Sequence, residues 1–172
     1  TLFSHYLFET IACFVRFINN YQPDSISMIE NSLFGVFTTI LQDTACETLH
    51  PYVFQIFGLL LESPSANIEM YKPLLRAFLE LQLWTSSDSV PSLARIIEAY
   101  IRRIPQVIGN DELEQIFIIF FLLVENKHTD HLGFDILTSI VHNFNKDKFE
   151  QKLPEVFTRT FQRLSSSKTN DL

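Results

Sequence analysis

The chain has 172 residues, of which 47% are hydrophobic and 17 are phenylalanine, so it carries enough apolar side chains for a continuous core. This composition excludes a disordered chain, and four glycines with few alternating strand patterns argue against a sheet protein. A formal net charge of −7 argues against non-specific binding of nucleic acid, because such binding requires clustered Lys and Arg. We therefore predict an all-α protein.

Cysteine content and apolar run length set the expected environment. Two cysteines, Cys13 and Cys46, are too few for a disulfide framework or a CxxC site, which favours a reduced intracellular compartment. The longest apolar run, residues 116–124, is well short of the roughly 20 residues that span a bilayer, so we expect no membrane insertion. No signal peptide is recognisable and the chain begins at Thr1, so we interpret it as a piece of a longer protein.

The first two expected helices form a pair. Residues 2–20 carry an apolar stripe at helical spacing, and residues 27–42 follow after a turn at Pro23. Ser27 and Glu30 have the spacing of a capping box, in which each side chain bonds a free backbone N–H at the start of a helix. We expect Glu30 to have that local role.

The next two pairs follow the same plan. The second pair covers residues 44–62 and about 70–82, with Pro73 in the first turn of the later helix, where its missing N–H costs little. The third pair covers residues 89–103 and a strongly apolar helix that Asn110 is expected to cap. A helix that is apolar on nearly every side is usually buried by neighbours on both flanks.

The fourth pair is predicted with a less regular end. Its first helix begins at Thr129 or Asp130, and its last helix begins near Asp147 and is kinked or restarted by Pro154. The polar tail, residues 165–172, is expected to fray.

Large side chains recur along the chain at intervals of 40 to 43 residues, the period of two-helix HEAT or armadillo units. One series lies in the second helices: Phe34 and Phe37, Leu75 and Phe78, Phe117 and Phe120, Phe157 and Thr160. Another lies in the first helices: Ile11, Phe54, Ile97 and Leu137; Phe14, Phe57, Tyr100 and Ile140; Ile18, Leu61, Ile104 and Phe144. We predict an α-solenoid of about four HEAT-type helical pairs, residues 1–42, 43–84, 85–127 and 128–172, with these stripes as its core rather than a docking groove.

The sequence contains only weak signatures of a metal, catalytic or phosphate-binding site. His128, His131 and His142 suggest a metal site, but no Cys or acid trio completes a tetrahedral ligand set. His5, His50 and Cys46 form no recognisable nucleophile and base pair. The single glycines Gly35, Gly58, Gly109 and Gly133 make no phosphate loop and are expected to permit close packing. We predict no enzyme activity, no cofactor and no metal.

Charge is distributed unevenly. Residues 1–142 carry a net −9, whereas residues 143–172 carry +2. An acidic body suits basic protein partners or simple solubility. The basic side chains near the end, interleaved with acids, fit either a solvated face or a contact with an acidic partner. They are Lys146, Lys148, Lys152, Arg159, Arg163 and Lys168.

Several stretches resemble one protein family, the importin-α re-exporters, also called the exportin-2 or cellular apoptosis susceptibility family of the importin-β superfamily. The similar stretches occur in the family's order and near its spacing: HYLFETI at 5–11, PYVFQIFGLLLE at 51–62, LW at 83–84, VPSLARIIEAYI at 90–101, HLGFDILTSI at 131–140 and FQRLSSSKT at 161–169. The chain resembles a segment from the middle to the C-terminal half of these proteins.

This resemblance implies a nuclear export receptor that shuttles between nucleus and cytoplasm, with importin-α and Ran-GTP as partners and nuclear pore proteins as further partners. In such solenoids the second helices line the concave face, where partners are expected. The polar residues between the core stripes of those helices are the candidate contacts: Thr38, Gln42, Arg76, Glu80, Glu114, Gln115, Arg159 and Gln162. The alternative is a HEAT scaffold subunit of another assembly, with no dependence on Ran.

Overall fold

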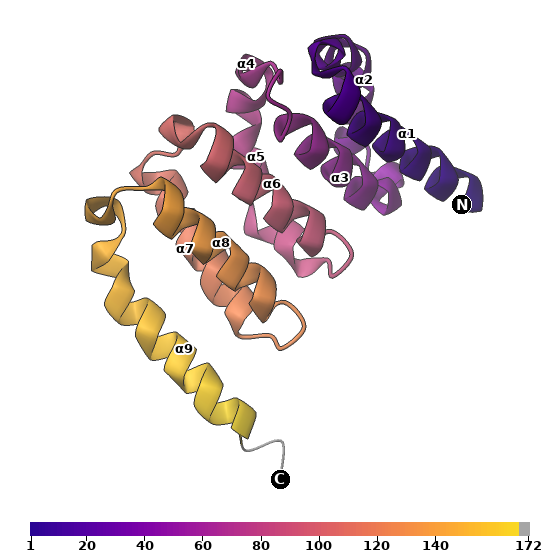
Figure 1. Cartoon of the computed structure of the whole chain (residues 1–172). Helices are drawn as coiled ribbons and strands as arrows, with labels where there is room; N and C mark the ends of the chain where they lie inside the picture. Colours follow the sequence, from indigo (N-terminus) through magenta and orange to yellow (C-terminus); the bar gives the residue numbers. More distant parts are fainter. Residues whose placement is uncertain (169–172) are drawn as a thin grey trace.

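The computed structural model describes residues 1–168, and its side chains through Ser165, as a row of helices without strands (Figure 1). Short 3₁₀ turns separate many of the helices. The tail predicted to fray is residues 165–172; residues 165–168 instead belong to α9, which contradicts the prediction there, and residues 169–172 lie outside the described residues. The α-helices are α1 (Leu2–Tyr21), α2 (Ile26–Gln42), α3 (His50–Leu61), α4 (Ile68–Tyr71), α5 (Leu75–Phe78), α6 (Val90–Arg103), α7 (Asn110–Val124), α8 (Asp130–Asn143) and α9 (Leu153–Lys168).

The helices form two layers, as a solenoid requires. The first helices of successive pairs, α1, α3, α6 and α8, lie side by side and pack in that order (Figure 1). The second elements are α2, the broken segment α4–α5, α7 and α9, and α7 packs against both α8 and α9. Each pair buries its apolar face on its neighbours, because one helical pair cannot do so alone. The predicted all-α solenoid is confirmed.

The second element of the second pair is not the continuous helix predicted for residues 70–82. It begins two residues earlier, at Ile68, so Pro73 lies past the first turn rather than within it. A proline there cannot donate a helical hydrogen bond, and its ring crowds the preceding turn. The segment therefore divides into α4, a 3₁₀ turn at Lys72–Leu74, and α5.

The core consists largely of the predicted stripes. Phe37, Phe54, Phe57, Phe117 and Phe120 are each at most 2% exposed. They belong to a cluster of buried side chains that runs through the stack.

Two members of the repeat series are not in the core. Phe14 is 61% exposed and Phe157 is 56% exposed, which contradicts their predicted burial. Both lie on the outermost helices, α1 and α9, where the face that an inner pair would cover is open to solvent.

Helix starts differ from the predicted caps. Ser25 precedes α2, and Glu30 is fully buried instead of capping. Asp43 precedes the 3₁₀ turn Thr44–Leu49 and accepts a hydrogen bond from the backbone N–H of Ala45. Gly109 precedes α7, where Glu112 accepts its N–H at 3.0 Å. A restart near Pro154 is confirmed, because α9 begins at Leu153.

Close packing explains one glycine clearly. A Cβ on Gly133 of α8 would lie 3.0 Å from Cγ2 of Val124, so the glycine lets α8 approach α7. A Cβ on Gly35 would meet no atom within 4 Å, so close packing is wrong as an explanation there. None of the described helices combines the length and apolarity needed to cross a membrane.

Candidate partner-binding face

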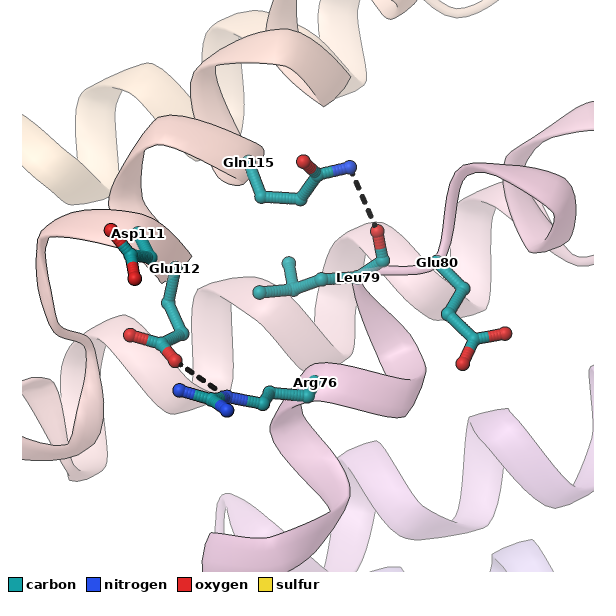
Figure 2. Close-up of a pocket in the computed structure, with 6 residues that line it drawn as sticks. All are labelled: Arg76, Leu79, Glu80, Asp111, Glu112 and Gln115. Atoms are coloured by element: carbon teal, nitrogen blue, oxygen red, sulfur yellow. Dashed lines mark hydrogen bonds and ion pairs between the residues drawn. The ribbon is translucent and has the colours of Figure 1, made fainter.

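A shallow groove lies between the second element of the second pair and the second helix of the third (Figure 2). Its volume is about 250 Å³. Three of the predicted contact residues, Arg76, Glu80 and Gln115, line it. The remaining lining residues are Leu79, Asp111 and Glu112.

Two interactions fix the walls of this groove. Nε of Arg76 donates to Oε1 of Glu112 at 2.8 Å, and Nε2 of Gln115 donates to the carbonyl of Leu79 at 3.3 Å. The hydrogen bond from Arg76, together with backbone N–H donors at the start of α7, lowers the pKa of the Glu112 carboxyl. The Glu112 side chain is only 12% exposed, whereas Arg76 remains 82% exposed.

The groove has an excess of negative charge. Figure 2 shows the carboxylates of Glu80 and Asp111 on either side of the Arg76–Glu112 pair. Three carboxylates and one guanidinium give a local charge of −2. Such a surface is complementary to a basic segment of a partner.

A second pair of predicted contacts meets at the other end of α7. Arg159 and Gln162 of α9 line a hollow of about 290 Å³ together with Phe121 of α7 and Glu125, the residue that follows α7. The Arg159 guanidinium donates to Glu125 at 2.8 Å and lies 4.7 Å from the centre of the Phe121 ring. It also donates to Glu155 of its own helix at 3.2 Å, so two carboxylates and an aromatic face contact its charge.

The other three predicted contacts lie apart from these hollows. Glu114 lines a separate hollow of about 370 Å³ and pairs with Lys152 at 2.5 Å. The Thr38 hydroxyl donates within α2, to the carbonyls of Phe34 and Gly35. Gln42 is exposed at the end of α2. The predicted contacts therefore do not form a single site. They lie at separate places along the second elements.

Sequence reasoning missed Asp111, Glu112 and Glu125 as lining residues. Asp111 and Glu112 lie in the first turn of α7, where acidic side chains are common because they complement the helix dipole. The spacing between Arg76 and Glu112 is 36 residues, somewhat less than one repeat. Opposite charges about one repeat apart were the signal available for this pair.

Four of the six terminal basic residues have intramolecular partners. Lys152 pairs with Glu114, Arg159 with Glu125, and Arg163 Nη2 lies 3.6 Å from Asp130. Lys148 donates to the carbonyl of Ile108 and lies over the Phe144 ring. The side chain of Lys168 lies outside the described ones. Neither sequence interpretation, solvated face or acidic partner, anticipated this set of contacts within the chain.

Among the described residues, the histidines do not come together as a metal site. Within residues 1–168, no group of three or more His, Cys, Asp and Glu side chains could hold a metal ion. His131 lies 4.0 Å from Asp130, and His5 is hydrogen-bonded to the Tyr52 hydroxyl at 3.0 Å.

The stacked helical pairs and the polar hollows between their second elements define a HEAT-type α-solenoid. The whole chain, residues 1–172, matches the family model described as CAS/CSE protein, C-terminus. The chain therefore belongs to the CAS/CSE family.

Similar proteins agree with this assignment. Exportin-2 of Danio rerio is 38% identical over 171 residues, covering 97% of this chain and 18% of the relative. Exportin-2 of Homo sapiens is 34% identical with the same coverage. A solved structure described as the exportin Cse1 in its cargo-free, cytoplasmic state aligns with a TM-score of 0.84 and 26% identity, covering 96% of this chain and 17% of that one. The chain thus spans about a fifth of the length of these relatives.

Proposed function

We propose that the chain is a segment of a nuclear export receptor that carries importin-α back to the cytoplasm in complex with Ran-GTP. The observation that carries this proposal is the family match over all 172 residues, joined by relatives named exportin-2. On this proposal the parent protein shuttles between nucleus and cytoplasm, and nuclear pore proteins are further partners. The role is protein binding without catalysis.

The proposed contact surface is the row of second elements, taken as the concave face of the solenoid. Two of its hollows each contain at least two predicted contacts and exposed charge: the groove with Arg76, Glu80 and Gln115, and the hollow with Arg159 and Gln162. The negative charge of the first supports docking of a basic segment, because complementary charge steers encounter and sets register. Thr38, Gln42 and Glu114 extend the proposed surface on either side.

The proposed mechanism is a shift between curvatures of the superhelix. Helical pairs contact only their neighbours, so small changes at each junction add up along a solenoid. If importin-α and Ran-GTP both bind best to the same curvature, each increases the affinity for the other by the same factor. This reciprocity separates an export receptor from a passive scaffold.

Calorimetry of the 172-residue chain tests the proposal. Importin-α is titrated with Ran bound to a non-hydrolysable GTP analogue, with Ran-GDP, and without Ran. Binding that appears only with the GTP form supports the coupled export role. Equal binding in all three mixtures supports a scaffold without Ran dependence, and no binding in any mixture contradicts a contact role for this stretch.

A further inference from the structure

Glu80 lines a second hollow besides the groove of Figure 2. This hollow has a volume of about 280 Å³ and lies where the starts of α3 and α6 meet the 3₁₀ turn Leu81–Thr85. Its lining includes the carboxylates of Glu47 and Glu80, the Ser89 side chain and the ring of Phe54, and we call it the Glu47–Glu80 hollow. The hollow belongs to the second and third pairs, which have a neighbouring pair on either side, so it is not an effect of the ends of the chain.

The two carboxylates of this hollow have no partner within the chain. Glu62 and Glu112, on adjacent helices, each accept a hydrogen bond from an arginine. Within residues 1–168, by contrast, neither the Glu47 nor the Glu80 side chain forms a hydrogen bond or an ion pair. No lysine or arginine lines the hollow, and the starts of α3 and α6 offset only about half a charge each. With His50 neutral, about one negative charge therefore remains uncompensated.

Ser89 adds an unpaired hydroxyl to the same lining. It precedes α6, where a serine side chain usually bonds a free backbone N–H, yet this side chain makes no capping hydrogen bond. Ser89 is only 5% exposed, and in the described part of the chain its hydroxyl has no hydrogen-bond partner. Side-chain polar groups that are this buried are normally hydrogen-bonded. An unpaired hydroxyl in the lining therefore indicates a group that a bound ligand completes.

The acceptors and the aromatic wall of the hollow fit a guanidinium better than a metal ion or an ammonium. Among residues 1–168, no group of three or more His, Cys, Asp and Glu side chains could hold a metal ion. A guanidinium presents five N–H donors in one plane and stacks on aromatic rings, whereas an ammonium is a compact point charge. Two carboxylates, a hydroxyl and the ring of Phe54 match the donors and the flat face of a guanidinium.

We infer that the Glu47–Glu80 hollow binds an arginine side chain of a protein partner. Glu47 and Glu80 accept its N–H groups, and the Ser89 hydroxyl is a further acceptor. Because Glu80 also lines the groove of Figure 2, a partner segment that lies in the groove can place an arginine in this hollow. The inference stands independently of the proposed function, because it concerns the chemistry of the bound side chain and is tested without importin-α or Ran.

A titration of the whole chain with N-acetyl-arginine amide, followed by the NMR shifts of backbone amides at constant ionic strength, tests the site. We expect saturable shifts at Gln82, Thr85 and Ser89, which line the hollow. The affinity should be about threefold higher than for N-acetyl-lysine amide and about fivefold or more higher than for the neutral N-acetyl-citrulline amide. The site is overturned if this segment shows no saturable shifts, or if the lysine or citrulline derivative binds as well as the arginine derivative.

Matched variants separate the site from the net charge. Glu47→Gln and Glu80→Gln should each weaken arginine binding by about threefold, because a carboxylate acceptor becomes a neutral amide. Glu150→Gln, at an exposed acid in the turn Glu150–Lys152, makes the same chemical change and should leave the affinity unchanged. Ser89→Ala should weaken binding by about twofold. Equal weakening by Glu150→Gln, or unchanged binding in both Glu47→Gln and Glu80→Gln while the other amide shifts show an intact fold, would refute the assigned acceptors.

Discussion

The phenol of Tyr71 donates a 2.7 Å hydrogen bond to the carboxylate of Glu30, 41 residues earlier, in the buried space between α4 and α2. The other carboxylate oxygen accepts the backbone N–H of Asn67 at 2.9 Å. The carbonyl of Tyr71 in turn accepts the phenol of Tyr100 on α6 at 2.7 Å. A fully buried carboxylate thus joins three successive pairs through directed hydrogen bonds, which is how such a group is tolerated in a core.

Removing one donor from this network should destabilise the fold. Tyr71→Phe leaves the Glu30 carboxylate with an unpaired oxygen, and a hydrogen bond to a charged group contributes about 1.5–3 kcal/mol. We expect the free energy of unfolding to fall by about that amount in urea denaturation. Tyr21→Phe, at a tyrosine 71% exposed at the end of α1, is the matched control and should be neutral. An unchanged midpoint for Tyr71→Phe would show that Glu30 does not depend on this phenol.

Alkaline pH should also destabilise the protein through the same tyrosines. Burial, and for Tyr71 the hydrogen bond to Glu30, raises the pKa of Tyr71 and of Tyr100 well above the usual value near 10. Above about pH 10 the unfolded chain loses these protons while the folded chain keeps them, so stability falls with pH, by about 1.4 kcal/mol per pH unit for each phenol. Below pH 10 the contribution is fully present.

Denaturation measured between pH 9 and 11.5 tests this slope. The double variant Tyr71→Phe/Tyr100→Phe removes both phenols and should lose stability less steeply over that range than the wild type. The single variant Tyr100→Phe should lie between them. Identical slopes for all three proteins would contradict the predicted linkage.

Two phenylalanines at equivalent repeat positions should respond differently to truncation. Phe117 on α7 is 1% exposed, and Phe157 on α9 is 56% exposed. Phe117→Ala should cost about 3–5 kcal/mol, because it leaves a cavity in a packed core. Phe157→Ala should change stability by no more than about 0.5 kcal/mol, as for an ordinary surface site. Thermal melts followed by circular dichroism compare the two, and equal losses would contradict the difference in burial.

The repeat period predicted the architecture because it reflects packing that every pair must satisfy. It could not reveal Glu30, whose spacing from Ser27 matches a local cap while its real partners, Asn67 and Tyr71, lie about one repeat away. That long-range contact has a local consequence. Asn67 precedes α4, so the helix begins at Ile68, and Pro73 then falls where a helix cannot continue.

The positions of the candidate contacts were predicted from the sequence, but their pairing was not. Periodicity placed Arg76 and Gln115 on second elements, and both line the groove of Figure 2. It could not show that Arg76 pairs with Glu112 rather than remaining free, because the pairing depends on the broken course of the chain before α5. Whether these residues meet a partner stays a prediction.

A charge reversal in the groove tests that prediction. Glu80 is exposed on the groove wall, so Glu80→Lys removes its attraction for a basic segment without opening a core contact. If the chain binds importin-α with Ran-GTP through this groove, the affinity measured by calorimetry should fall by roughly three- to tenfold, and the difference should shrink at high salt. Asp24→Lys makes the same charge change at an exposed site in the turn Pro23–Ser25 and should leave the affinity within about twofold. Equal affinities for the two variants would place the partner surface elsewhere on the solenoid, because the net charge is the same in both.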